Sequence, residues 1–299
     1  MPEKPSGFRK TFQALQREIT QLPEVRSPYL KAIEKARDGR TLVSFFISFW
    51  SPAPLIQEDA DHLEEILCNS DCKKGVTLLL DAPGGDGLAA ERIIQICKSY
   101  SKGDFETIVA ARAKSAATMV CLGADRILMS ATSELGPIDP QVPMDLTGTG
   151  EMEWVAAHHI VKAYDELFDG AKGLSDGHIE PYLQQLQKLN AVKIAQLRDA
   201  TKLSEDIAVN SLVNGMLKGK SIAEIRDLIK PFTNPEVTMS HGRSINYQQA
   251  RECGLNVELI DLESELWRSI WGLYVRSKHL VDSMGPSKLV DTLEGSYFS

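Results

Sequence analysis

The order of local patterns between residues 41 and 130 constrains the fold more than any other feature of the sequence. Short runs rich in apolar and β-branched residues are typical of strands at 41–48, 74–82, 105–112 and 125–130. Apolar residues at helical spacing fill the gaps at 59–70, 87–100 and 115–124. Strands that alternate with helices pair in parallel through right-handed crossovers. The sequence therefore predicts an α/β fold built on a mostly parallel sheet.

The remaining segments suggest how the chain is divided. We expect a helical, charged N-terminal arm at 1–40, one domain at 41–261, and a C-terminal helix and polar tail at 262–299. Within the domain, helical patterns dominate 151–230, which predicts a helical insertion about there.

The end of the predicted domain has a different pattern. Residues 232–245 break the helical periodicity and have an extended character. A helix is expected at 246–255, ending at Gly254 as a C-cap, and a last strand at 256–261.

Composition and charge exclude several classes of function. The 299 residues carry a net charge of −8, which argues against a nucleic-acid surface or a basic membrane patch. The most apolar run, 41–50, is about half the length needed to cross a bilayer, and the N-terminus has no apolar signal-peptide core. We therefore expect a cytoplasmic protein with no membrane span and no nucleic-acid partner.

The five cysteines do not form a recognisable framework. Their positions are 68, 72, 97, 121 and 253, an odd number without regular spacing, which indicates reduced thiols. Cys68 and Cys72 lack the second pair of ligands that a zinc site needs. No metal or other cofactor is expected.

The stretch LLLDAPGGDGLAAERI (78–93) is the first candidate for chemistry. A strand that opens into Gly84 and Gly85 before a helix presents free backbone N–H groups, either to a phosphate or to an oxyanion. A phosphate is disfavoured because no Lys-Ser/Thr follows, the spacing is not GxGxxG, and Asp86 would repel it. A plain tight turn between strand and helix is the alternative without function.

The second candidate lies in ARAKSAATMVCLGA (111–124), where Ser115 begins an Ala-rich helix. At this place the hydroxyl meets the positive end of the helix dipole, and the N–H of Ala116 lies beside it. Serine is also a common N-cap, so Ser115 could have a purely structural role.

A serine nucleophile needs a base, and the base needs a group to orient it. Asp139 in ELGPIDPQV and His241 in MSHGRSI could supply these roles if the fold brings them to Ser115. A histidine in a loop is more often a surface residue, and sequence spacing alone cannot decide between the two.

These segments, in this order, resemble the Clp protease/crotonase fold. DAPGG, AKSAATMVCLGAD and ILMSATSELGPIDPQ are similar to blocks of the Clp proteolytic subunit and of signal peptide peptidase A. The chain most resembles the serine dehydrogenase proteinase family, whose late segment is similar to SHGRSINYQQARECGLNV (240–257). The resemblance covers roughly 40–260 and implies a Clp/crotonase-like parallel sheet with repeated ββα units and a helical extension.

The resemblance also implies site residues. It assigns Ser115 as the nucleophile of a serine endopeptidase, and Gly84 or Gly85 together with Ala116 as the oxyanion hole. The Clp subunit has its histidine where this chain has Asp139, so the family order Ser, Asp, His implies Asp139 as the orienting group and His241 as the base.

Other relatives imply other readings of the same residues. Signal peptide peptidase A uses a Ser–Lys dyad, for which Lys172 is the better candidate and Lys162 the other. A catalytically inactive scaffold or peptide-binding protein and a crotonase-like acyl-CoA enzyme also remain open. Proteins of this fold usually assemble, so we expect a homo-oligomer that acts on a peptide or protein substrate.

Overall fold

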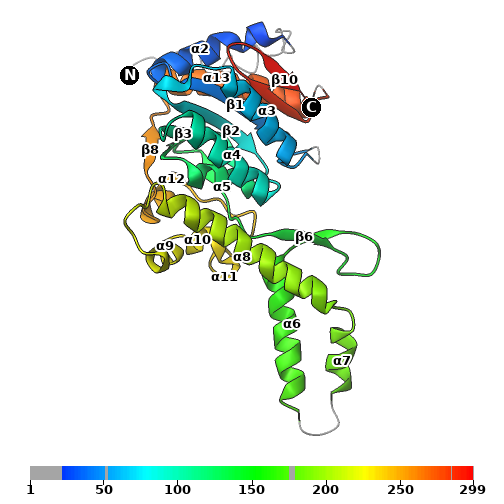
Figure 1. The fold of residues 1–299 in the computed structure, drawn as a ribbon. Coiled ribbons are helices and arrows are strands. Elements are labelled where there is room, and N and C mark those ends of the chain that lie inside the picture. The colour runs from blue at the N-terminus through cyan, green and yellow to red at the C-terminus, as the bar shows by residue number, and fades with distance from the viewer. Residues whose placement is uncertain (1–21, 51–52, 175–178, 284, 299) are drawn as a thin grey trace, which may run out of the picture.

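The sheet of the computed structural model joins strands from both ends of the chain. The structure describes residues 22–50, 53–174, 179–283 and 285–298 (Figure 1). Within them, five parallel strands follow the order β1-β2-β3-β4-β8. Their bounds are Thr41–Ile47, Val76–Ala82, Phe105–Ala113, Arg126–Ser130 and Val257–Ile260. The predicted α/β class and parallel sheet are confirmed.

Three further strands complete this sheet. β9 (Lys288–Asp291) runs antiparallel beside β1, and β10 (Ser296–Phe298) runs antiparallel beside β9. β5 (Glu134–Leu135) pairs with the last two residues of β3. Part of the segment expected to be a polar tail therefore forms two strands of the sheet. This pairing is long-range and leaves no local signal in the sequence.

Helices cover both faces of the sheet. One face is covered by α3 (Gln57–Cys68), α4 (Gly87–Tyr100) and α5 (Ala116–Gly123), and the other by α2 (Ser27–Ala36) and α13 (Glu265–Ser283) (Figure 1). Short helices outside these layers include η2 (Pro23–Val25), η3 (Cys72–Lys74) and α12 (Tyr247–Glu252).

The two cores follow from the alternation of side chains along each strand. In β1, Val43 and Phe45 belong to the core under α3, α4 and α5, whereas Leu42 and Phe46 belong to the core under α2 and α13. A strand buried on both faces must be apolar throughout, which explains the nearly continuous apolar runs in the sequence.

A helical extension leaves the body after β5. It begins with a hairpin of β6 (Gln141–Met144) and β7 (Glu153–Ala156), and continues through α6 (Ala157–Lys172), α7 (Glu180–Leu186) and α8 (Ala191–Val213). Figure 1 shows α6 and α7 projecting from the body and α8 running back to it. Three short helices then return the chain to the sheet: α9 (Ile222–Leu228), α10 (Lys230–Thr233) and α11 (Pro235–Thr238).

Two local predictions were wrong. Residues 154–156, predicted as the start of a helix, belong to β7 because they pair with β6. Residues 232–238 are largely helical, not extended, because prolines at 231 and 235 start two short helices. The division at 40 and 261 stays a prediction, and residues 1–21 of the expected N-terminal arm lie outside the described residues.

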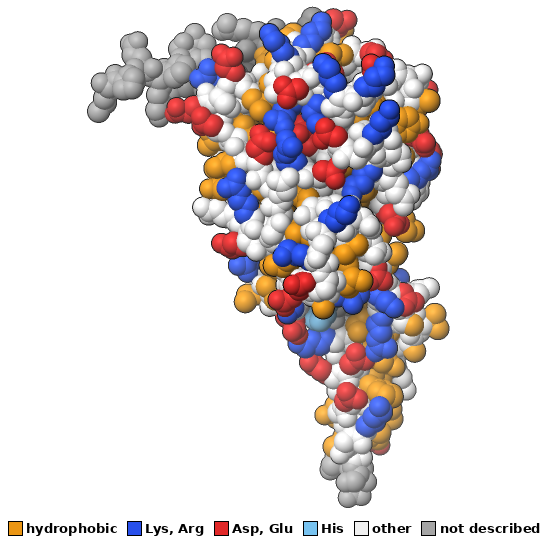
Figure 2. Space-filling view, turned by 60° about the vertical axis from the view of Figure 1, so that its left-hand side comes forward, with side chains coloured by type: hydrophobic (Ala, Val, Ile, Leu, Met, Phe, Trp, Pro, Cys, Tyr) orange, Lys and Arg blue, Asp and Glu red, His pale blue; other side chains and the backbone are white. Residues whose placement is uncertain are grey.

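The surface carries charges of both signs. Figure 2 shows Lys and Arg side chains interspersed with Asp and Glu over the visible face of the body, without a patch of one sign there. No helix among the described residues combines the length and the apolar character that a membrane span requires.

Asp81 fixes an irregularity between β2 and β3, just before the glycine turn. The register shifts there, so that Asp81 alone faces residues 110–112 of the neighbouring strand. The Asp81 Oδ1 atom accepts a hydrogen bond of 2.9 Å from the backbone N–H of Arg112. Burial raises the pKa of this fully buried carboxyl to about 6, although Lys278 Nζ, 3.8 Å from Oδ2, opposes the rise.

We expect Asp81 to make the stability of the protein depend on pH. Because its pKa rises from 3.8 to about 6 on folding, the stability that it contributes is present below pH 3.8 and is lost as the pH rises through about 6. The Asp81→Asn substitution should abolish this decrease in the free energy of unfolding with rising pH, which is on the order of 2–3 kcal/mol. The free energies of unfolding of both proteins in urea, measured between pH 4 and pH 7, test it.

An Asp71→Asn variant, which changes an exposed carboxylate, serves as the control. A constant difference between wild type and Asp81→Asn across this pH range would contradict the account.

Candidate active site

Ser115 sits in a strained turn between β3 and α5. Its backbone has φ +49° and ψ −120°, a region that costs a residue with a side chain on the order of 1–3 kcal/mol. Among the described residues its hydroxyl finds no helix-capping hydrogen bond, so the N-cap reading does not account for this serine. The N–H of Ala116, in the first turn of α5, is one of the groups that a helix leaves unpaired.

Gly84 packs directly against this turn. Its φ of +115° lies where side chains are disfavoured, and a Cβ atom there would lie 2.6 Å from the Cβ of Ser115 and 2.9 Å from the carbonyl oxygen of Lys114. Only glycine fits, because the ends of β2 and β3 approach so closely. This close packing against Ser115 indicates that the glycine turn does more than connect a strand to a helix.

The next peptide exposes a backbone donor. The N–H of Leu55 donates to the carbonyl oxygen of Gly84, and the N–H of Asp86 donates to the carbonyl oxygen of Leu55, both at 2.8 Å. In a trans peptide the C=O and N–H point in opposite directions, so the N–H of Gly85 points away from Leu55. Gly85 is exposed and lines the same cleft as Ser115. An N–H in this place can stabilise a developing oxyanion.

The structure brings Asp139 and His241 together across 102 residues of sequence. His241 Nδ1 lies 2.9 Å from Asp139 Oδ1, and Gln141 Nε2 donates to Asp139 Oδ2 at 2.7 Å. Asp139 is 4% exposed, whereas the His241 side chain is 28% exposed. In a neutral imidazole whose Nδ1–H donates to the carboxylate, Nε2 is left as a proton acceptor. Sequence reasoning missed Gln141, although it lies only two residues after Asp139.

Lys114 ties the serine turn to the segment that follows His241. Its Nζ lies 2.6 Å from Glu134 Oε2 and 3.2 Å from the carbonyl oxygen of Leu135. The Ser244 hydroxyl donates to Glu134, and Leu135 pairs with Ile245. Partial burial opposes ionisation, yet the hydrogen bonds from Lys114 and Ser244 hold the pKa of Glu134 below its ordinary value. Nothing local in the sequence indicates these contacts of Lys114.

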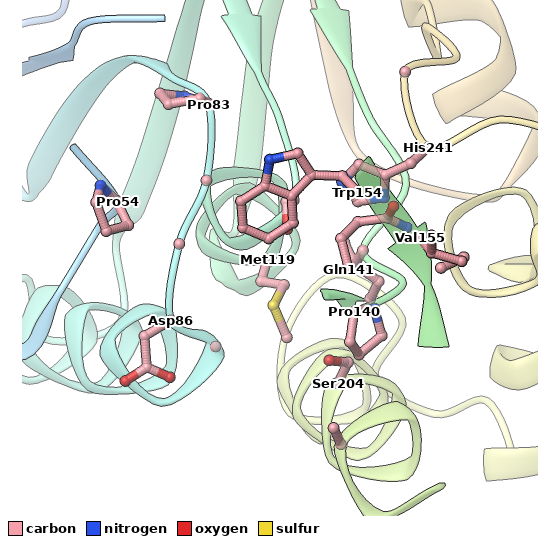
Figure 3. Close-up of a pocket in the computed structure, with 18 of the residues that line it drawn as sticks. Pro54, Pro83, Asp86, Met119, Pro140, Gln141, Trp154, Val155, Ser204 and His241 are labelled. Carbon is pink, nitrogen blue, oxygen red and sulfur yellow. The ribbon is translucent and has the colours of Figure 1, made fainter. Parts of the chain in front are cut away.

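Several of these residues line one large cleft. Gly84, Gly85, Ser115 and His241 line a cleft of about 1350 Å³ between the glycine turn and the hairpin of β6 and β7 (Figure 3). Within the described residues, no hydrogen bond joins the Ser115 hydroxyl to His241. Hydrogen bonds between a nucleophile and its base often form only when a substrate is bound.

The alternative base, Lys172, lies in the helical extension. Lys172 is the last residue of α6, in the part of the extension that projects from the body (Figure 1). Its side chain is 64% exposed, 3.8 Å from Asp169 and over the ring of Phe168. A lysine base must be buried to lower its pKa, and Lys172 is not among the described residues that line the cleft. Lys162 forms an exposed ion pair with Glu236 at 2.6 Å.

Burial makes at least two of the cysteines poor nucleophiles. All five are free, and burial raises the pKa of the Cys121 thiol to about 12 and that of Cys253 to about 11. In the described part of the chain no three His, Cys, Asp or Glu side chains are placed to hold a metal ion.

Replacing Gly84→Ala tests the close packing against Ser115. Gly103→Ala is a matched control, because Gly103 has φ +85° but no atom among the described residues within 4 Å of a Cβ placed there. We expect Gly84→Ala to cost about 1–3 kcal/mol more in the free energy of unfolding, because the methyl group overpacks the turn. Chemical denaturation of both variants measures this difference, and equal costs would show that the contact is not tight.

Comparison with known proteins places the chain in a family. Over residues 54–270 the sequence matches the family described as ClpP-like SDH-type serine proteinase. The uncharacterized protein MJ0137 of Methanocaldococcus jannaschii is 27% identical over 208 residues, which cover 67% of this chain and 59% of that protein. The uncharacterized protein MJ1495 of the same organism is 34% identical over 67 residues, 22% of this chain and 23% of that protein. The chain thus spans less than two thirds of the length of these curated relatives.

The fold is similar to that in a solved structure of a mutant of the 1510-N membrane-bound stomatin-specific protease. The alignment covers 74% of this chain and 79% of the chain in that structure. The TM-score is 0.41 and the sequence identity 14%. The family match covers most of the sequence, includes both the glycine turn and Ser115, and confirms the resemblance stated from the motifs. This chain belongs to the ClpP-like SDH-type serine proteinases.

Proposed function

We propose that this protein hydrolyses peptide bonds as a serine endopeptidase, with Ser115 as nucleophile, His241 as base and Asp139 as the group that orients it. The observation that carries the proposal is the contact of 2.9 Å between His241 Nδ1 and Asp139 Oδ1. The imidazole of His241 lines the same cleft as Ser115, whose hydroxyl makes no helix-capping hydrogen bond. Nucleophilic acyl transfer needs a serine, a base and a group that orients the base, and here a buried carboxylate holds an imidazole that lines the same cleft as the serine.

In the first half of the proposed reaction, Ser115 Oγ attacks the peptide carbonyl carbon while His241 Nε2 takes the hydroxyl proton. The carbonyl oxygen becomes an oxyanion that accepts hydrogen bonds from the N–H groups of Gly85 and Ala116. Gly84 allows the turn to approach, and Asp139 stabilises the imidazolium that forms.

The intermediate then collapses. His241 returns its proton to the leaving amine as the C–N bond breaks, which leaves an ester between the acyl group and Ser115. Water, deprotonated by His241, attacks the carbonyl carbon of this ester. The bond between that carbon and Ser115 Oγ then breaks, His241 returns the proton to Oγ, and the carboxylic acid product leaves. Each hydrogen-bond donor to the oxyanion contributes roughly 10²–10³ in rate.

An acyl-CoA enzyme is less well supported by the same cleft. The phosphates of CoA are bound by cationic side chains in proteins. Among the described residues, no Lys or Arg lines this cleft.

Labelling with a fluorophosphonate probe tests the proposed site. We expect wild type to label, and Ser115→Ala and His241→Ala to lose labelling by about 10³-fold or more, because the hydroxyl is unreactive without its base. Asp139→Asn should also label slowly, because the imidazole loses its orienting carboxylate. Mass spectrometry of the labelled peptide identifies the modified residue.

Two controls sharpen this experiment. His62→Ala changes a histidine stacked on Tyr297, outside the cleft lining, and should label like wild type. Lys172→Ala should also label normally, whereas its failure would point to a Ser–Lys dyad. Absence of labelling in folded wild type would contradict the peptidase and favour an inactive scaffold.

We also propose that the protein works as a homo-oligomer in the cytoplasm, with contacts through the helical extension. Its own core holds few buried residues, and several large apolar side chains stay exposed on it: Phe168, Leu174, Leu183 and Val192. The five free thiols fit a reducing compartment. Light scattering at micromolar concentration should report a mass above 33.0 kDa, and the monomer mass would contradict the assembly.

A further inference from the structure

The floor of the cleft is apolar and deeply buried. Met119, Ile138 and Ile207 line it and are each at most 3% exposed. A charged side chain that reached this floor would lose its hydration and find no ionic partner there. The floor therefore selects apolar side chains.

The rim is also apolar, but it faces solvent. Trp50 is 83% exposed, Met239 80% and Trp154 72%. In the view of Figure 3 the indole of Trp154 lies across the opening, between the turn that bears Pro83 and the loop that bears His241. Large apolar side chains grouped around a cleft mark a surface that is covered by a ligand.

The charges in the cleft all have one sign. Asp86 and Glu153 are the charged side chains among the described residues of the lining, and no Lys or Arg joins them. Within the described structure neither carboxylate takes part in an ion pair, and Asp86 is held by the N–H of Leu88. Although Arg112 and Lys278 lie against the ring of Phe49 in the wall, both carboxylates of the lining are anionic, which favours cationic groups of a ligand over carboxylates beside them.

The size of the cleft indicates a polymer. Its volume of about 1350 Å³ exceeds the roughly 300–1,000 Å³ of typical small-molecule sites. We propose that it binds an apolar peptide segment flanked by basic, not acidic, residues. This substrate class rests on the proposed peptidase function and adds Trp154, Asp86 and Glu153 as the residues that set specificity.

Direct binding tests the proposal without catalysis. The full chain carrying Ser115→Ala is titrated against three decapeptides bearing a neutral fluorophore, and anisotropy gives each Kd. The first peptide is Leu- and Val-rich with a Lys at each end, the second has Glu in place of both Lys, and the third keeps Lys but replaces the apolar residues with Ser and Thr.

We expect the Lys peptide with the apolar centre to bind about tenfold more tightly than its Glu counterpart at low salt, with the ratio shrinking as salt rises. The Ser- and Thr-rich peptide should bind more weakly than the apolar Lys peptide. Adding Trp154→Ala should weaken binding of the apolar Lys peptide by about 30-fold, the effect of losing a central aromatic contact.

A variant that lacks both carboxylates of the cleft tests the role of charge most directly. Asp86→Asn with Glu153→Gln keeps a side chain that can cap α4 and removes both charges, so it should abolish the preference for Lys over Glu. Glu65→Gln, an exposed carboxylate on α3, and Phe298→Ala, an exposed aromatic on β10, are the matched controls and should change nothing.

Equal Kd values for the Lys and Glu peptides, or no effect of Trp154→Ala, would overturn the inference. Because this assay lacks the Ser115 hydroxyl, its result is independent of the labelling experiment. Labelling without peptide discrimination would refute the substrate class alone, whereas discrimination without labelling would refute the catalytic site alone.

Discussion

The close approach of Gly84 to Ser115 is the contact on which the candidate site depends. Parallel pairing places the ends of β2 and β3 side by side, and the absence of a side chain at Gly84 lets the two turns touch. The serine can then adopt its positive φ, with its hydroxyl free of a capping role. The same contact places Gly85, the next residue of the turn, in the cleft that Ser115 also lines.

The second half of the site is built by long-range contacts. Asp139 lies just after β5, and His241 reaches it only after the whole helical extension, which lies between the two residues in the sequence. The Lys114 ion pair with Glu134 and the pairing of Leu135 with Ile245 bind this returning segment to the serine turn. Within this extension, β7 supplies Trp154 to the wall of the cleft.

The sequence predicted what depends on local pattern. Continuous apolar strands, a paired glycine turn and a serine before an Ala-rich helix all have short-range signatures, and so the α/β sheet was predicted correctly from them. Two strands were not predicted, because each depends on a partner strand. Residues 154–156 form a strand only by pairing with β6 across a hairpin. The C-terminal segment forms a strand only by pairing with β1, which is distant in sequence.

The same limit applies to the site. Asp139 and His241 could be proposed from residue type and family resemblance, but no spacing could show that they meet, nor that Gln141 supports the carboxylate. The contacts of Lys114 could not be predicted either, because its partners, Glu134 and Ser244, are not its neighbours in sequence. Roles in catalysis stay predictions for all these residues.

The most direct test of the central claim is a crystal structure of the protein after reaction with a fluorophosphonate. The account predicts a phosphonyl group on Ser115 Oγ, its oxygen accepting hydrogen bonds from the N–H groups of Gly85 and Ala116, and His241 Nε2 within hydrogen-bond distance of the Ser115 oxygen. An adduct on another residue, or one whose oxygen points away from both N–H groups while His241 stays remote, would contradict it.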